Sequence, residues 1–145
     1  MLKESIFPIL EFDSNKQAKL QPSSIIQKTP VPNACVITFF KEVINKKLES
    51  GELEQIGTSP SETVDIPIYE TKYNGCHVGL VGGFVGAAGS AAFFAVSKFR
   101  NVLLGQILYG GDDLSGIEWN NRSWISREKI RTNLVDLCLK IAVEL

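Results

Sequence analysis

The sequence predicts an α/β protein with a three-layer-like mixed sheet and flanking helices. A continuous run of apolar and β-branched residues, Ala34–Phe40, is typical of a strand buried on both faces. Asn74-Gly75 is the strongest short hairpin signal in the chain and separates two strand patterns. Residues 77–94 change from an apolar strand to a glycine-rich turn and then to a helix. Strands that alternate with helices in this way indicate a layered α/β architecture.

Length and charge limit the class of protein further. The 145 residues are enough for one domain, 1–145, and too few for two. The 15 basic and 16 acidic side chains contain no run of Lys or Arg, so we expect no nucleic-acid partner. The start of the chain lacks a signal-peptide core, and the longest apolar region is broken by glycines and ends at Lys98. We therefore expect a cytoplasmic protein without a membrane partner.

The first half of the chain is predicted to contain an extended arm, a strand, a helix, a loop and then two strands joined by a hairpin. Residues 1–33 have little periodicity and several prolines, which predicts an extended arm. After the strand Ala34–Phe40, the spacing of apolar residues predicts an amphipathic helix over Lys41–Glu54 that kinks or ends at Gly51. A polar loop, Gly57–Glu62, follows. The next two predicted strands, joined by Asn74-Gly75, are Val64–Tyr73 and Cys76–Val81.

The second half predicts a strand–helix–strand unit followed by a last helix. Ala91–Arg100 is expected to be a helix packed on the sheet, and Val102–Tyr109 another buried strand, parallel to the strand before the helix. Leu114–Trp124 has a loop composition, and Ser126 is a suitable cap for the last helix. The apolar stripe predicted for that helix consists of Ile130, Leu134, Leu137, Cys138 and Ile141.

The glycine-rich turn is the first candidate ligand site. Its glycines lack Cβ where the chain turns sharply, so backbone N–H groups can point at a bound anion near the helix start at Ser90. Their spacing fits neither a dinucleotide-binding fingerprint nor a phosphate-binding P-loop. The alternative is that the small residues only let helix and strand pack closely. The glycines of this turn are Gly82, Gly83, Gly86 and Gly89.

Two aspartates form the second candidate. Asp112 and Asp113 follow a predicted buried strand, so a carboxylate there would face the same edge of the sheet as the glycine turn. Such a group could exchange a proton with a ligand if burial raised its pKa, whereas Gly-Gly-Asp-Asp is also ordinary turn chemistry. Arg127 and Arg131 lie one helical turn apart within plausible reach, although surface charge is the common explanation for both.

The remaining reactive or aromatic residues have structural explanations. The three cysteines are odd in number, lie far apart and sit in apolar patterns, so we expect buried reduced thiols without a metal site or disulfide framework. His77, the only histidine, lies in a strand pattern and is expected to be structural. Trp119 and Trp124 could stack on a base or sugar, or equally cover the edge of the domain. The cysteines are Cys35, Cys76 and Cys138.

Two blocks resemble the nucleoside phosphorylases, the family that includes purine nucleoside and uridine phosphorylases. The amino-terminal block, about Phe7–Phe94 with its motifs in 34–94, contains Cys-Val-Ile-Thr-Phe-Phe-Lys-Glu-Val-Ile and Gly-Gly-Phe-Val-Gly-Ala-Ala-Gly-Ser-Ala-Ala-Phe-Phe. The carboxyl-terminal block, 91–145, contains Ala-Phe-Phe-Ala-Val-Ser-Lys-Phe-Arg and Tyr-Gly-Gly-Asp-Asp-Leu-Ser-Gly. The resemblance covers nearly the whole chain and implies a reduced nucleoside phosphorylase fold.

The resemblance also implies that a middle section is missing. In the family that section supplies a phosphate-binding arginine, most contacts to the nucleobase and the glutamate that holds the ribose hydroxyls. Here one Ala-Ala-Phe-Phe serves both blocks, as though the section had been excised at a shared short sequence. The Gly-Asp-Pro-x-Arg phosphate loop of many members has no match in this chain.

Family roles can still be carried over to matching positions. Asp112 falls where purine-specific members carry the aspartate that protonates the departing base, and Asp113 is the close alternative. Arg131 resembles an arginine that swings toward that aspartate, and Arg127 remains possible because of the longer loop. The loop that lines the phosphate and ribose side of the pocket corresponds to Gly83 and Gly86, with Ser90 beside them.

The activity implied by the resemblance is reversible phosphorolysis of a purine or pyrimidine nucleoside to free base and pentose 1-phosphate. Inorganic phosphate would be the co-substrate, with no metal or organic cofactor, and electrostatic stabilisation would supply most of the catalysis. We expect a homo-oligomer, because removal of central strands leaves an open sheet. The alternative is a catalytically inactive shortened relative that acts as a binding or oligomer-assembly subunit.

Overall fold

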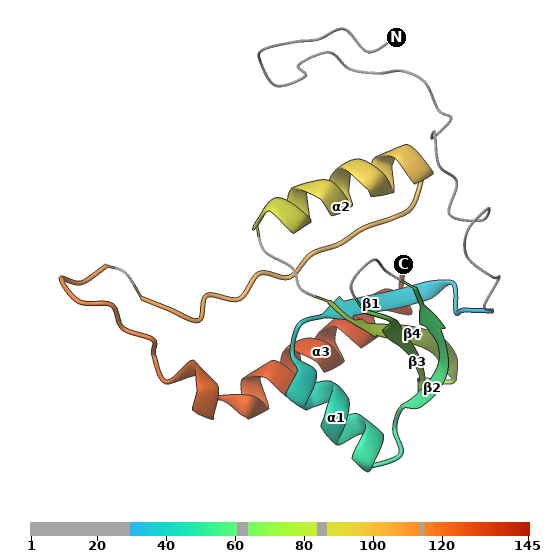
Figure 1. Cartoon of the computed structure of the whole chain (residues 1–145), viewed down its shortest axis with the longest axis horizontal. Helices are drawn as coiled ribbons and strands as arrows, with labels where there is room; N and C mark the ends of the chain where they lie inside the picture. Colours follow the sequence, from blue (N-terminus) through green and yellow to red (C-terminus); the bar gives the residue numbers. More distant parts are fainter. Residues whose placement is uncertain (1–29, 61–63, 84–86, 114) are drawn as a thin grey trace, which may run out of the picture.

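The computed structural model describes residues 30–60, 64–83, 87–113 and 115–145, so most of the predicted arm lies outside it (Figure 1). The described residues form a mixed α/β fold with a four-stranded sheet, as predicted at this level. The elements in chain order are β1 (Ala34–Thr38), α1 (Lys41–Glu49), β2 (Glu54–Ser59), β3 (Ile66–Tyr73), β4 (Cys76–Gly82), α2 (Ala87–Arg100), the 3-10 turn η2 (Trp124–Ser126) and α3 (Glu128–Ala142).

The sheet has the strand order β1-β4-β3-β2 and mixes parallel and antiparallel pairs. β1 runs parallel to β4 with Val36 opposite Leu80, whereas β3 is antiparallel to both β4 and β2. The predicted hairpin between β3 and β4 is confirmed. Asn74 and Gly75 both have positive φ, 49° and 81°, as a tight two-residue hairpin turn requires.

The hydrophobic core lies between one face of this sheet and the helices α1 and α3. α1 begins after β1 and buries Val43 and Ile44, in agreement with the predicted amphipathic pattern. Gly82 faces α1, where a Cβ would lie 3.2 Å from Ile44 Cδ1, so glycine permits this close approach. The buried core residues are Val36, Phe40, Val43, Ile44, Leu53, Val78, Leu80, Val135 and Leu139.

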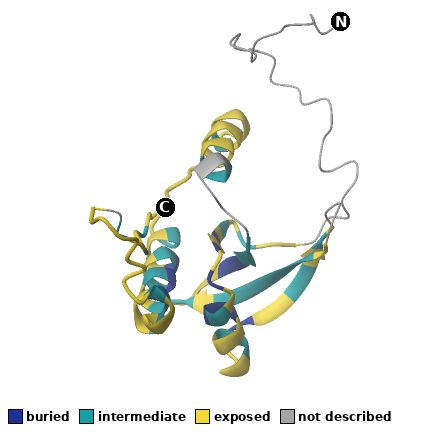
Figure 2. Ribbon diagram, turned by 60° about the vertical axis from the view of Figure 1, so that its left-hand side comes forward, coloured by how far each residue is buried: buried dark blue, intermediate teal, exposed yellow. Residues whose placement is uncertain are grey.

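The opposite face of the sheet is uncovered in the part of the chain that the structure describes. Cys35, Ile37 and Phe39 are exposed there, and α2 lies apart from the sheet (Figures 1 and 2). The prediction that β1 is buried on both faces is therefore wrong, and the described residues form no third layer on this face. Among the described strands β1 is at the edge of the sheet, beside β4. The residues on this uncovered face, called the bare face below, are Cys35, Ile37, Phe39, Val81, Ile66 and Ile68.

The predicted strand Val102–Tyr109 is not formed. These residues have no assigned secondary structure and are almost all exposed, so the predicted parallel strand–helix–strand unit is also wrong. An apolar run becomes a strand only where a neighbouring strand takes up its backbone hydrogen bonds, and none of the described strands pairs with this segment. Conversely, β2 (Glu54–Ser59) forms where a helix end and a polar loop were expected.

The last helix differs from its prediction in cap and orientation. Arg127 occupies the N-cap without a side-chain hydrogen bond, and the Ser126 hydroxyl donates instead to the Ser123 carbonyl at 2.7 Å. The helix buries Val135 and Leu139 rather than the predicted stripe, which is left partly exposed at Ile130, Leu137 and Ile141. None of the described helices has the length and apolar character needed to cross a bilayer.

Candidate functional site

The end of β1 is where the two predicted ligand-binding segments approach each other. Gly83, which follows β4, donates its backbone N–H to the Thr38 carbonyl at 2.9 Å. Tyr109, which precedes the two aspartates, packs edge-on against Phe40 with ring centroids 6.4 Å apart. Ligands in α/β sheets bind beyond the carboxyl ends of parallel strands, and β1 and β4 are such a pair. We call the group Thr38, Phe40, Gly83 and Tyr109 the β1 corner.

The backbone N–H that was predicted to bind an anion at this corner already has a hydrogen-bond partner. The N–H of Gly83 bonds to Thr38, so it does not point at an open site. Gly86 lies outside the described residues. Ser90 is in the first turn of α2, apart from the sheet, and its Oγ accepts a hydrogen bond from Gln106 Nε2 at 2.6 Å. The described members of the predicted phosphate-binding set therefore do not converge.

The aspartates lie on the exposed segment that follows the β1 corner. Asp113 forms an antiparallel bridge with Asn120, and its Oδ1 accepts hydrogen bonds from the Ser115 hydroxyl and backbone N–H at 2.6 and 2.9 Å. These two bonds lower the pKa of Asp113 below its ordinary value. Asp113 is thus ionised at neutral pH and has no proton to donate. Asp112 is exposed.

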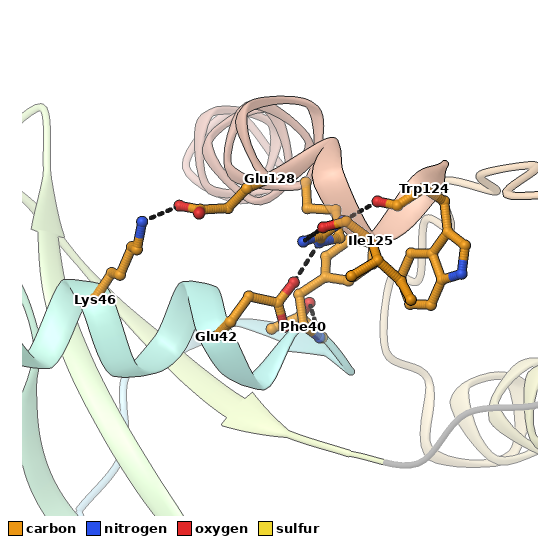
Figure 3. A network of polar contacts seen from close by, with 8 residues as sticks. Phe40, Glu42, Lys46, Trp124, Ile125 and Glu128 are labelled. Atoms are coloured by element: carbon orange, nitrogen blue, oxygen red, sulfur yellow. Dashed lines mark hydrogen bonds and ion pairs between the residues drawn. The ribbon is translucent and has the colours of Figure 1, made fainter. Parts of the chain in front are cut away.

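Arg131 is buried, and its guanidinium group is committed to other partners than the aspartates (Figure 3). Its Nε donates to Glu42 of α1, and Nη1 and Nη2 donate to the carbonyls of Trp124 and Ile125, the latter at 3.1 Å. The guanidinium carbon also lies 5.2 Å from the Trp124 ring centroid, a cation–π contact. Arg131 therefore fastens η2 against α1 and α3.

Sequence reasoning missed the residues around a hollow of the described surface. This open hollow has a volume of about 590 Å³ and lies where the end of α1 meets β2, β3 and α3. Lys47 is central to it, because its Nζ bonds to both Glu52 and Asp136 at 2.9 Å. No spacing in the sequence predicts this group, because Asp136 is far along the chain from Lys47 and Glu52. The lining residues are Lys47, Gly51, Glu52, Leu53, Glu54, Glu70, Thr71, Lys72, Tyr73, Asp136 and Leu139.

The electrostatics of this hollow are those of a structural ion-pair group. Burial lowers the pKa of Lys47, but hydrogen bonds to Asp136 and Glu52 outweigh it and raise that pKa overall. Hydrogen bonds from Lys47 and Ser50 lower the pKa of Glu52. Lys47 and Glu52 are therefore charged and paired at neutral pH. None of Gly83, Asp112, Asp113 or Arg131 lines this hollow.

The cysteines and the histidine take surface positions. Cys35 and Cys76 are exposed and Cys138 is half-buried, so the prediction of buried thiols is wrong for the first two. Their strands have only one covered face, and Cys35 lies on the other. Burial raises the pKa of the Cys138 thiol. His77 Nδ1 contacts the Glu70 carboxylate across the β3–β4 pair.

Comparison with known proteins does not assign this chain. No protein-family model matches it, and neither a curated protein nor a solved structure matches it significantly. Among the described residues, no group of three or more His, Cys, Asp and Glu side chains is arranged to hold a metal ion. The function must therefore be argued from the residues and their geometry.

Proposed function

We propose that this chain is a nucleoside phosphorylase-like protein that, in its shortened form, acts as an assembly subunit and does not turn over nucleosides. The two sequence blocks support the kinship. The observation that carries the loss of turnover is the burial of Arg131, whose three guanidinium nitrogens all donate to groups other than Asp112 and Asp113. The uncovered face of the sheet supports the assembly role. We also propose that the chain adopts a reduced form of the nucleoside phosphorylase fold.

The hydrogen bonds of Arg131 argue against a catalytic role for this residue. To swing toward an aspartate, the side chain would have to give up three charge-assisted hydrogen bonds, each worth about 1.5–3 kcal/mol. It would also leave Glu42 without its cationic partner. Arg127 is exposed, and no described contact holds its side chain near Asp112 or Asp113.

The other family roles also lack the surroundings that catalysis needs. The lowered pKa of Asp113 opposes proton donation to a departing base. The N–H of Gly83 is bonded to Thr38 and cannot hold phosphate without breaking that bond. The resemblance implies that a phosphate-binding arginine and a ribose-binding glutamate belong to the section missing here. Losing such preorganised groups costs several kcal/mol of transition-state stabilisation.

Phosphorolysis itself is the second candidate, and one observation favours it. Gly83 and the segment leading to Asp112 both meet the β1 corner, the edge at which an α/β protein binds its ligand. In this reading a phosphate oxygen attacks the anomeric carbon of the sugar as the glycosidic bond breaks. Asp112 gives its proton to the base that leaves.

A product assay separates the two candidates. The purified full chain is incubated with phosphate and either inosine, adenosine or uridine, and released base is measured by chromatography. We expect no more base than in a protein-free blank. Release that is abolished by Asp112→Asn and unchanged by Glu49→Gln, an exposed control on α1, would refute the assembly role and support phosphorolysis.

A further inference from the structure

The helix α2 is apolar on nearly all sides and yet exposed. From Ala87 to Ser97 it carries no charged side chain, and its only charges, Lys98 and Arg100, are in the last turn. A helix that is apolar all round is normally buried. Here Phe93, Phe94, Val96 and Phe99 remain 38–56% exposed, so α2 lacks the neighbours that its composition requires.

The segment after α2 extends this apolar surface. The chain reverses at Asn101, which has a positive φ of 54°, and Val102 N–H bonds to the Ser97 carbonyl at 2.9 Å. It then runs back along α2, where Gln106 bonds to Ser90 (Figure 1). We call residues 87–108 the apolar arm. Its further exposed apolar side chains are Val102, Leu103, Leu104, Ile107 and Leu108.

The bare face of the sheet also exposes apolar side chains that no described element covers. Ile37 of β1, Val81 of β4 and Ile68 of β3 lie side by side in one apolar row across three strands. Ile37 is 44% exposed, and Phe39 continues the apolar surface beyond the end of β1 at 53%. The charged Glu70, His77 and Lys72 lie toward the other end of this face.

The position of α2 in the chain, after β4, favours packing of the apolar arm on the bare face. A helix that follows a strand of a sheet normally packs back on a face of that sheet. α2 follows β4 but lies apart from it, and the face that such a helix would cover is empty (Figures 1 and 2). The same contact can form between two chains when they exchange this element.

The apolar arm exposes about as much apolar area as one partner contributes to a standard interface. With about 150–200 Å² for each large apolar side chain, the exposed fractions in the apolar arm amount to on the order of 800 Å² per chain. A standard protein interface buries about 800 Å² on each partner. An exposed apolar surface of this size on a folded protein marks an interaction site.

We propose that two copies of this chain form an exchanged dimer in which the apolar arm of each copy covers the bare face of the other. A second copy is favoured because each chain offers both surfaces, so a twofold dimer covers all of them. A membrane surface fits poorly, because α2 lacks the basic polar face of interfacial helices. This inference deepens the assembly role proposed above. The product assay and the tests below have separate readouts, so either can fail alone.

The first test measures mass by light scattering over a concentration series. The native chain should be dimeric and dissociate on dilution. Val96→Asp on α2 and Ile37→Glu on the bare face should each weaken the dimer at least tenfold. Asn45→Asp, which adds one negative charge at an exposed position of α1, should leave it unchanged. Circular dichroism checks that each variant remains folded.

Mixing the two weakened variants distinguishes this dimer from a simple contact between two α2 helices. Val96→Asp retains an intact bare face, and Ile37→Glu retains an intact apolar arm. A mixture should therefore form a heterodimer through one restored contact, more tightly than either variant alone. Self-association of Ile37→Glu at native strength would overturn the proposal, because α2 would then not bind the sheet.

A crosslinking test measures the proximity of the two surfaces directly. Cys35 lies on the bare face, Cys76→Ser removes the other exposed thiol, and Ala95→Cys introduces a thiol on α2. A short bismaleimide should join them between chains and give a covalent dimer on a denaturing gel, which Cys35→Ser in the same protein should abolish. A monomer at every concentration, or a monomer that instead co-sediments with anionic lipid vesicles, would overturn the proposal.

Discussion

One guanidinium group holds three separate segments of the described chain together. Arg131 lies on α3, its carboxylate partner Glu42 on α1, and its two carbonyl partners in η2. A cation with only 4% of its surface exposed is tolerated because these partners replace the water it has lost. Lys46 and Glu128 form a second contact between α1 and α3 nearby, but both side chains are largely exposed and add little (Figure 3).

Removing the Arg131 side chain should therefore destabilise the fold far more than removing a neighbouring arginine. Arg131→Ala leaves the Ile125 carbonyl without its donor and Glu42 without its cationic partner, and we expect a loss of about 2–3 kcal/mol in the free energy of unfolding. Arg127→Ala removes an exposed side chain and should cost less than about 0.5 kcal/mol. Urea denaturation measures both. Equal costs for the two substitutions would show that Arg131 is not a structural anchor.

At the scale of elements, local chemistry determines the β3–β4 hairpin. Asn74 and Gly75 occupy the left-handed region that a two-residue turn requires, and the strands on either side pair from Tyr73 and Cys76 onward. Nothing lies within 4 Å of a Cβ at Gly75, so its backbone conformation, and not crowding, is the reason for glycine there.

Gly75→Ala should destabilise the hairpin for that reason. A side chain at φ +81° costs roughly 1–2 kcal/mol. Gly105→Ala is the matched control, because a Cβ there also meets nothing within 4 Å and its φ is in the ordinary range. We expect the control to change stability by less than about 0.5 kcal/mol. Thermal unfolding of the two variants gives the comparison, and a neutral Gly75→Ala would contradict the turn assignment.

The elements that the sequence predicts well are those with local signals. The hairpin, α1 and the existence of α3 follow from turn residues and helical spacing within short windows. β2 was missed because its strand character depends on pairing with β3, and its own residues are mostly polar. The run Val102–Tyr109 was predicted as a strand because composition cannot tell whether a neighbouring strand exists.

At the scale of the molecule, the sheet with α1 and α3 is well packed and the apolar arm is not. Hydrogen exchange should reflect this division, because amides exchange slowly where opening requires global unfolding. In dilute protein we expect α2 to exchange much faster than β4. Raising the concentration should slow exchange in α2 for the native chain and not for Ile37→Glu. Mass spectrometry of peptic fragments measures this, and equal protection of α2 and β4 in the monomer would contradict it.

The sequence could predict candidate residues for the site but not their surroundings. It placed the glycine turn and the aspartates at one sheet edge through a strand over 102–109 that is not formed, and only Gly83 and Tyr109 contact the residues at the end of β1. The partners of Arg131 and of Asp113 could not be foreseen, since they depend on how η2 and the loop at Ser115 fold back. Those partners determine the charge of Asp113 and whether the side chain of Arg131 can move.

The parallel pairing of β1 with β4 has a consequence for the order in which the chain folds. Residue 34 finds its partner at residue 78, so β1 cannot join the sheet until the chain between them has been arranged. The hairpin β3–β4, by contrast, closes over two residues within microseconds. We therefore expect the hairpin to form first, β1 to add to it later, and α3 to complete the core last, because its contacts with β1 and α1 span the most sequence.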